Sequence, residues 1–164
     1  MRTGFPYLRI SATRQQLDWI TADGVGESTW SVSTARNGLG ERRGSECTPR
    51  GWHVIRAKIG EGQPLGAVFK ARRPTGEVYD EALAQREPGR DWILTRILWL
   101  GGLEPGFNRY GSVDTTWRYI YLHGSPDSGV DGQPRSHGCI RLRSADICDL
   151  FSRVQPGLRV WIGA

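Results

Sequence analysis

One cysteine of the chain lies in the sequence beside two of its 3 histidines. The segment reads Ser136-His137-Gly138-Cys139-Ile140-Arg141-Leu142, and His123-Gly124 stands upstream of it. A cysteine attacks as its thiolate, whose free pKa lies near ~8.5, and a neighbouring imidazole or fixed positive charge makes it reactive at neutral pH. The residue types therefore indicate a thiol nucleophile with an imidazole base.

The spacing within this segment favours a shared face. Residues two apart on an extended strand project to the same side, so we expect His137, Cys139 and Arg141 to lie together. Gly138 leaves the backbone uncrowded, and its amide and that of Cys139 are candidates for the oxyanion hole that acyl transfer requires. His123 ends an apolar run, 119–122, that is typical of a strand. The residues alone leave open which histidine is the base.

Zinc binding is the competing chemistry for these side chains. Its ligands would be His123, His137, Cys139 and Cys148, but the chain has no Cys-x-x-Cys pair and no His-Glu-x-x-His helix. We therefore predict no metal site. We also predict no cofactor, because a thiolate with a general base needs none.

The elements that position these groups are mainly β. Short β-branched or aromatic runs bounded by Gly, Pro or Asp predict strands and a β-sandwich, over residues 8–11, 16–21, 28–33, 52–59, 92–100, 119–123 and 159–162. Alternation predicts that Trp117, Tyr119, Tyr121 and His123 share one face of their strand.

One clear helix is predicted after the cysteine strand. Ser144 is its expected N-cap, apolar residues at 147, 150, 151 and 154 recur at helical spacing, and Pro156-Gly157 ends it. Cys148 is expected to be buried within it. A weaker pattern at 79–85 predicts a shorter helix.

Two glycine- and proline-rich segments are predicted loops. The stretch from 101 to 116 enters the His123 strand and offers Arg109 as a candidate substrate-binding residue. The stretch from 124 to 135 is expected to cover the nucleophile.

The motif from His123-Gly124 through Ser136–Leu142 resembles the active-site signature of the YkuD-type L,D-transpeptidase family. Residues 30–35, Trp-Ser-Val-Ser-Thr-Ala, and 48–55, Thr-Pro-Arg-Gly-Trp-His-Val-Ile, are similar to the upstream "VSTG … TPxGxF" stretch of that family. Ala35 departs from the pattern, where a glycine is common. Residues 56–90 look like an insert that reshapes the substrate cleft.

The resemblance implies roles for individual residues. Cys139 is the acylated nucleophile, His123 its base, and the Gly124 carbonyl orients the imidazole. His137 supports the cleft, and the Gly138 and Cys139 amides hold the oxyanion. Arg141 is structural or binds a carboxylate, and Ser136 is a further substrate-binding candidate. The implied fold is a YkuD-like β-sandwich of mixed sheets with one clear helix after the catalytic strand.

Composition predicts a single catalytic domain over residues 1–164. The net charge is +5, but the basic residues are scattered and match no nucleic-acid reader, so we expect no nucleic-acid partner. The longest apolar stretch, 97–100, is far short of the ~20 residues of a membrane span, so we expect no membrane partner. Oligomeric state is left open.

The resemblance implies attack on the L,D-peptide bond of a peptidoglycan stem. The N-terminal residues show no signal sequence, and 3 cysteines fit a reducing compartment, so a cytoplasmic location is expected. A signal peptide removed from the sequence would make it periplasmic. The predicted function is an L,D-carboxypeptidase that removes the terminal D-alanine from tetrapeptides or muropeptides during recycling. The alternatives are an exported L,D-transpeptidase, which crosslinks peptidoglycan or attaches lipoprotein, and a non-catalytic peptidoglycan-binding module.

Overall fold

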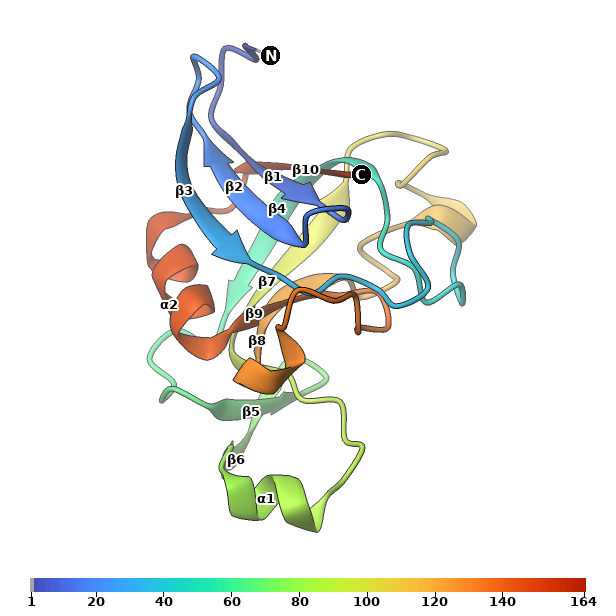
Figure 1. Cartoon of the computed structure of the whole chain (residues 1–164). Helices are drawn as coiled ribbons and strands as arrows, with labels where there is room; N and C mark the ends of the chain where they lie inside the picture. The colour runs from blue at the N-terminus through green and yellow to red at the C-terminus, as the bar shows by residue number, and fades with distance from the viewer. Residues whose placement is uncertain (1) are drawn as a thin grey trace.

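A curled mixed β-sheet dominates the structure, a computed structural model in which residues 2–164 are described (Figure 1). Its strands are β1 Tyr7–Ser11, β2 Gln16–Ile20, β3 Gly26–Ser31, β4 Gly51–Ile59, β5 Ala67–Lys70, β6 Arg73–Val78, β7 Leu94–Gly102, β8 Tyr121–Ser125, β9 Ile140–Arg143 and β10 Arg159–Gly163. The helices are α1 Glu81–Arg86 and α2 Ser144–Arg153, with 3-10 turns at Gly111–Val113 and Asp127–Gly129.

The strands join edge to edge in the order β3-β2-β1-β10-β4-β7-β5-β6, and β8 pairs with both β7 and β9. The pairs β1/β10 and β8/β9 are parallel, and the remaining pairs are antiparallel. The mainly β prediction with mixed pairing is confirmed. The two layers of the predicted sandwich are parts of one sheet, because it curls on itself.

The main core lies between this sheet and α2. Leu122 of β8 and Ile140 and Leu142 of β9 are fully buried, together with Ile147 and Leu150 of the helix. Since side chains alternate along a strand, the residues between these apolar positions must face the other side of the sheet. That other side carries the candidate site.

The helix α2 confirms the predicted element but corrects its start. Arg143 is the N-cap, without a side-chain capping bond, and Ser144 is the first helical residue. The Ser144 hydroxyl instead accepts a hydrogen bond from Thr95 Oγ1, at 2.7 Å. Cys148 is partly exposed rather than buried.

The helix α1 confirms the weaker prediction for residues 79–85. The Asp80 carboxylate caps it by accepting a hydrogen bond from the Leu83 amide at 2.7 Å. Loss of such a cap typically costs about 1 kcal/mol.

The segment before His123 contradicts the predicted alternation. The strand β8 begins only at Tyr121, and Tyr119 has φ of +58°, so residues 115–119 form turns. Trp117 and Tyr119 are 53% and 47% exposed. Their rings pack on Trp99 instead, each with a centroid separation of 6.2 Å. The aromatic residues therefore gather by contacts with β7 rather than by strand periodicity.

The insert-like segment 56–90 forms the end of β4, the β5/β6 hairpin and α1. Lys70 pairs with Arg73, and the two turn residues Ala71 and Arg72 have φ of +47° and +65°. Hairpin turns of this kind favour Asn-Gly, because non-glycine residues are strained at positive φ.

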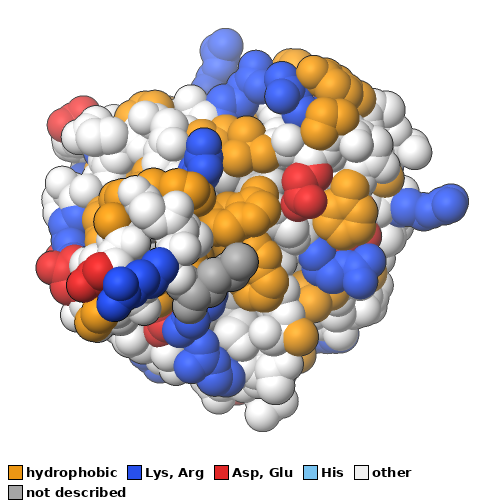
Figure 2. All heavy atoms as spheres, turned by 90° about the horizontal axis from the view of Figure 1, so that it is seen from above, with side chains coloured by type: hydrophobic (Ala, Val, Ile, Leu, Met, Phe, Trp, Pro, Cys, Tyr) orange, Lys and Arg blue, Asp and Glu red, His pale blue; other side chains and the backbone are white. Residues whose placement is uncertain are grey.

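The end of the molecule that carries the N-terminus has a group of hydrophobic side chains beside basic ones, seen from above in Figure 2. The rings of Phe5, Tyr7 and Trp52 meet edge to face, and the Arg159 guanidinium lies 4.2 Å from the centre of the Phe5 ring. This aromatic cluster lies where β1, β10 and β4 are neighbours in the sheet.

His53 on β4 is a fully buried histidine away from the cysteine motif. Its ring nitrogens lie 3.0 Å from the Gly51 carbonyl and 3.0 Å from Thr115 Oγ1. Burial lowers the pKa of His53 to about 4, although the Gly51 carbonyl and Glu41 act in the opposite direction. The folded protein therefore holds this imidazole neutral.

We predict that stability falls as the pH drops from 7.5 to 5. Unfolded His53 takes up a proton near its ordinary pKa of 6.5, whereas the folded residue stays neutral, so the unfolded state gains protons first. The loss from this residue is roughly 2 kcal/mol over that window. Urea unfolding of His53→Gln should show a clearly shallower pH slope than that of the wild type. Equal slopes in the two proteins would contradict the assignment.

Candidate active site

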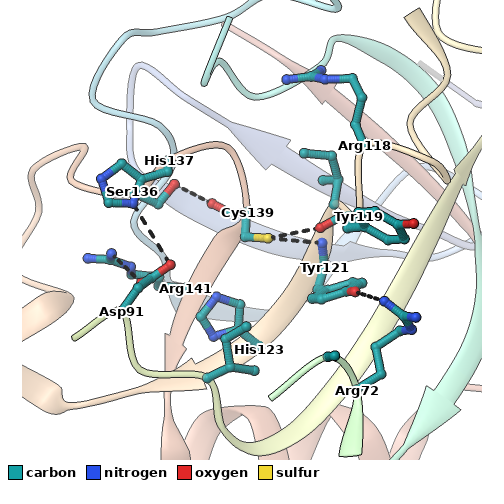
Figure 3. Close-up of a pocket in the computed structure, with 13 residues that line it drawn as sticks. Arg72, Asp91, Arg118, Tyr119, Tyr121, His123, Ser136, His137, Cys139 and Arg141 are labelled. Carbon is teal, nitrogen blue, oxygen red and sulfur yellow. Dashed lines mark hydrogen bonds and ion pairs between the residues drawn. The ribbon is translucent and has the colours of Figure 1, made fainter. Parts of the chain in front are cut away.

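The candidate site lies on the face of β8 and β9 opposite the core. The two strands are parallel, with Leu122 opposite Ile140 and His123 opposite Arg141. Side chains alternate across a sheet, so Tyr121, His123, Cys139 and Arg141 all project away from the core. They open into a cavity of about 520 Å³ (Figure 3), lined by Ala71, Arg72, Asp91, Ile93, Arg118, Tyr119, Ile120, Tyr121, His123, Ser136, His137, Cys139 and Arg141.

His123 is 1% exposed, and its Nδ1 lies 2.7 Å from the Gly124 carbonyl oxygen. A carbonyl can only accept a hydrogen bond, so this contact assigns the proton of the neutral imidazole to Nδ1. The other nitrogen, Nε2, then carries the lone pair that a base needs. Burial lowers the pKa of His123, which keeps the ring neutral near pH 7.

Gly124 occupies a place that admits only glycine. It pairs with Leu94 of β7, and a Cβ on residue 124 would lie 2.4 Å from the Leu94 carbonyl oxygen. Because β7 passes so close, the carbonyl that holds His123 is fixed in position. The geometry matches the orienting role that the family resemblance implies for Gly124.

The Cys139 thiol has two backbone contacts at the mouth of the cavity. The Tyr121 amide donates to Sγ at 3.3 Å, and Sγ donates to the Tyr119 carbonyl at 3.4 Å. Burial raises the pKa of Cys139 to about 12, and only partial compensation comes from the Tyr121 amide, Arg141 and Arg118. The resting pair is therefore a neutral thiol and a neutral imidazole.

The turn before Cys139 uses Ser136 and Gly138 differently from our expectation. The Ser136 hydroxyl donates to the Cys139 carbonyl at 2.5 Å and accepts from the Gly138 amide at 3.2 Å. Gly138 has φ of +134°, and Thr48 Oγ1 donates to its carbonyl at 2.9 Å. The Gly138 amide is thus engaged inside the turn, and its role as an oxyanion donor stays a prediction. Ser136, 2% exposed, holds the turn with its hydroxyl.

His137 and Arg141 meet at a carboxylate that sequence reasoning missed. Arg141 Nη2 lies 3.0 Å from Asp91 Oδ1, and His137 Nδ1 lies 3.8 Å from Asp91 Oδ2. The expected single strand for His137, Cys139 and Arg141 is wrong at its start, because β9 begins at Ile140. Figure 3 shows His137 turned toward Asp91, with His123 as the imidazole on the inner side of Cys139. The geometry therefore favours His123 as the base.

Two further expectations find no support in the cavity. Arg109 lies 4.8 Å above the Tyr110 ring and lines a different hollow with Val54 and Asp114. No residue between 125 and 135 lines the cavity, so that loop does not cover Cys139. The turn Ala71-Arg72 from the insert-like segment lines it instead. The only sequence signal of this turn is its lysine and arginine content between two short segments. Such a signal does not predict where the hairpin packs.

The alternative zinc set is not brought together. Cys148 lies on α2, which packs on the opposite face of the sheet from His123 and Cys139. Across residues 2–164 no group of three or more His, Cys, Asp or Glu side chains is arranged to hold a metal ion. Over the same residues no helix has the length and apolar character needed to cross a membrane.

A partly exposed thiol, an imidazole whose Nδ1 carries the proton and a carbonyl that orients this ring define a cysteine acyl-transfer site. The chain belongs to the YkuD family, the L,D-transpeptidase catalytic domain, whose family model matches residues 6–162. No curated protein matches the chain.

Solved L,D-transpeptidases are similar to the chain in fold. That from Xylanimonas cellulosilytica has 18% identity and a TM-score of 0.56, covering 97% of this chain and 60% of that one. The enzyme from Mycobacterium smegmatis has 18% identity and a TM-score of 0.55, with 97% and 58% covered. L,D-transpeptidase 3 from Mycobacterium tuberculosis, in complex with a faropenem-derived adduct, has 16% identity and a TM-score of 0.56, with 97% and 60% covered. The chain thus spans about 60% of the length of these solved chains.

We predict that Gly124→Ala destabilises the protein by roughly 1–3 kcal/mol, because the new methyl group meets the Leu94 carbonyl. Urea unfolding measures the change. Gly26→Ala is the matched control, since a Cβ at residue 26 meets nothing within 4 Å. A Gly124→Ala protein as stable as the control would show that β7 does not fix this carbonyl.

Proposed function

We propose that the chain is a thiol L,D-carboxypeptidase that removes the terminal D-alanine from peptidoglycan tetrapeptide stems. The observation that carries the proposal is the Cys139 thiol in one cavity with His123, whose Nδ1 proton is held by the Gly124 carbonyl. Family membership supports acyl transfer on peptidoglycan peptides. Removal of the last residue is the finer step that we add.

In the proposed mechanism His123 Nε2 takes the Sγ proton as Cys139 attacks the scissile carbonyl carbon. The Tyr121 amide donates to the sulfur, and the Cys139 amide is the candidate donor to the developing oxyanion. The C–N bond then breaks, and His123 returns the proton to the leaving amine of D-alanine. Water attacks the thioester, giving its proton to His123, and the thiol is regenerated with release of the shortened peptide.

The charge of the cavity supports a carboxylate-bearing donor and water as acceptor. Three arginines, Arg72, Arg118 and Arg141, line it against a single carboxylate, Asp91. A positive lining attracts an anionic peptide and repels the ammonium form of an amine acceptor. This charge supports the hydrolytic reaction of the proposal.

A cytoplasmic role in muropeptide recycling is part of this proposal. The thiols of Cys47, Cys139 and Cys148 are all free, which is consistent with a reducing compartment.

Transpeptidation is the second candidate function, and one observation favours it. A neighbouring hollow of about 350 Å³ shares Arg118, Tyr119, Ile120 and His137 with the main cavity. It offers room for an acceptor peptide next to the main cavity. A non-catalytic binding module is disfavoured, since such a module has no need of an oriented base beside a thiol.

Mass spectrometry of the products tests the proposal directly. Purified protein incubated with a disaccharide-tetrapeptide should release one alanine, and added stem-peptide amine should give no crosslinked dimer. Cys139→Ala should lower the rate by more than about 10³-fold, because the nucleophile is lost. Cys148→Ser, on the opposite face of the sheet, is the control and should stay active. A crosslinked product would establish transpeptidation, and no product from the wild type would overturn both enzymatic functions.

We predict a flat pH profile of kcat/KM between about pH 6.5 and 9. Activity needs the neutral thiol-imidazole pair, and kcat/KM reports the free enzyme. The pKa of His123 lies below its usual 6.5, so the acid limb falls below that pH, while the pKa of Cys139 at about 12 puts the basic limb beyond the range. Initial rates at low substrate concentration across pH 5–9 measure the profile. An acid limb centred near pH 8 would contradict the neutral pair.

A further inference from the structure

The three arginines of the cavity are not equally available to a ligand. Arg141 is paired with Asp91 at 3.0 Å. Arg118 donates to the Gly40 and Cys47 carbonyls, at 3.2 and 2.7 Å, and to Ser45 Oγ at 3.3 Å. The donors of Arg118 are therefore taken up by the protein itself, and the charge of Arg141 is paired with a carboxylate.

Arg72 differs from them in its partners. Among residues 2–164 its one hydrogen bond runs from Nη1 to the Tyr121 phenol oxygen, at 3.0 Å, and no carboxylate pairs with it. A guanidinium carries five N–H donors in a rigid fork that suits a carboxylate. Most donors of Arg72 are thus free for a ligand.

Aromatic contacts hold this free guanidinium in place. Its central carbon lies 4.8 Å from the Trp99 ring centre and 4.9 Å from that of Tyr119. It is presented by a turn in which both Ala71 and Arg72 have positive φ. Strained backbone of this kind persists where the surroundings impose it, and it gathers at ligand-binding sites.

Tyr121 connects Arg72 to the reacting sulfur. Its amide donates to Cys139 Sγ, while its phenol accepts from Arg72, so one tyrosine side chain separates the two functional groups. Figure 3 shows Arg72 and the pair Asp91-Arg141 on opposite sides of Cys139. When the scissile carbonyl of a peptide contacts Sγ, the residue that follows it extends about 3.5 Å further. That residue can point toward Arg72 or toward the Asp91-Arg141 pair.

We propose that Arg72 binds the free α-carboxylate of the residue that leaves, and so restricts cleavage to the bond next to a C-terminus. This inference rests on the proposed function, because it names how that site selects its substrate. Arg72 is then a specificity residue that contacts substrate, while Trp99, Tyr119 and Tyr121 position it. An interior peptide bond offers no carboxylate at this point and is a poor substrate.

A matched pair of affinity labels tests the proposal without requiring turnover. N-bromoacetyl-D-alanine and its C-terminal amide both deliver an alkylating carbon to Cys139, and only the first carries the carboxylate. Peptide mapping of Cys139 gives the alkylation rate for each label. We expect the acid to react ~10- to 100-fold faster than the amide in the wild type, the range typical of a hydrogen-bonded charge.

Substitution of Arg72 should remove this preference. In Arg72→Gln the acid-to-amide ratio should fall to about one, because the acid loses its partner, and Arg72→Lys should retain an intermediate ratio. Arg73→Gln, the exposed neighbour on β6, is the matched control and should keep the wild-type ratio. Circular dichroism checks that each variant is folded.

Three outcomes would overturn the proposal. These are a wild type with no acid preference, an Arg72→Gln protein that keeps the preference, and one that slows both labels equally, which would mark a purely structural residue. A Cys139 that neither label modifies would also count against it, because so small a label needs only an open cleft. A separate result would contradict the proposed function alone. In that case no alanine would be released from the tetrapeptide, while the wild type would still react faster with the acid label than with the amide label.

Discussion

The parallel register of β8 and β9 is the constraint on which the site depends. Leu122 lies opposite Ile140, and both are fully buried with Leu142. Burial of each such side chain contributes about 1.5–3 kcal/mol. A one-residue slip of β9 against β8 would turn Ile140 and Leu142 to the other face and Cys139 into the core. Hydrophobic burial on one face of the sheet thus holds the nucleophile and its base together on the other.

The sequence was sufficient where chemistry and neighbours are local. The cysteine motif and the helix after it follow from short segments, and most strands were located to within a few residues, although β5 and β6 were missed. The sequence was not sufficient where a side chain's contact partner is distant along the chain. Asp91 lies 50 residues before Arg141, and Arg72 comes from a hairpin whose docking no local pattern encodes. The alternation through Tyr119 failed because Trp99 offers the aromatic residues a packing surface that competes with strand formation.

Burial sets the electrostatics of the site. It raises the pKa of the Cys139 thiol and lowers that of His123, so both shifts oppose a resting thiolate-imidazolium pair. The protein then relies on geometry instead of charge to prepare the reaction. Arg118 contributes to this geometry, because its bond to the Cys47 carbonyl fixes a group that would lie 3.3 Å from a Cβ on residue 138. This contact and the positive φ of Gly138 both disfavour any residue other than glycine at position 138. They also hold the turn before Cys139 in one conformation.

The fold separates the groups that perform the reaction from those that choose the substrate. The β5/β6 hairpin joins the sheet through the pair Val68-Leu94 and the bond from the Phe69 amide to the Ile93 carbonyl. Its turn, beyond these contacts, can change sequence without shifting β8 against β9. The chain keeps the fold of solved relatives at 16–18% identity. Arg72 lies on this turn and lines the cavity of Cys139. The proposed choice of substrate therefore depends on a segment that does not position the catalytic pair.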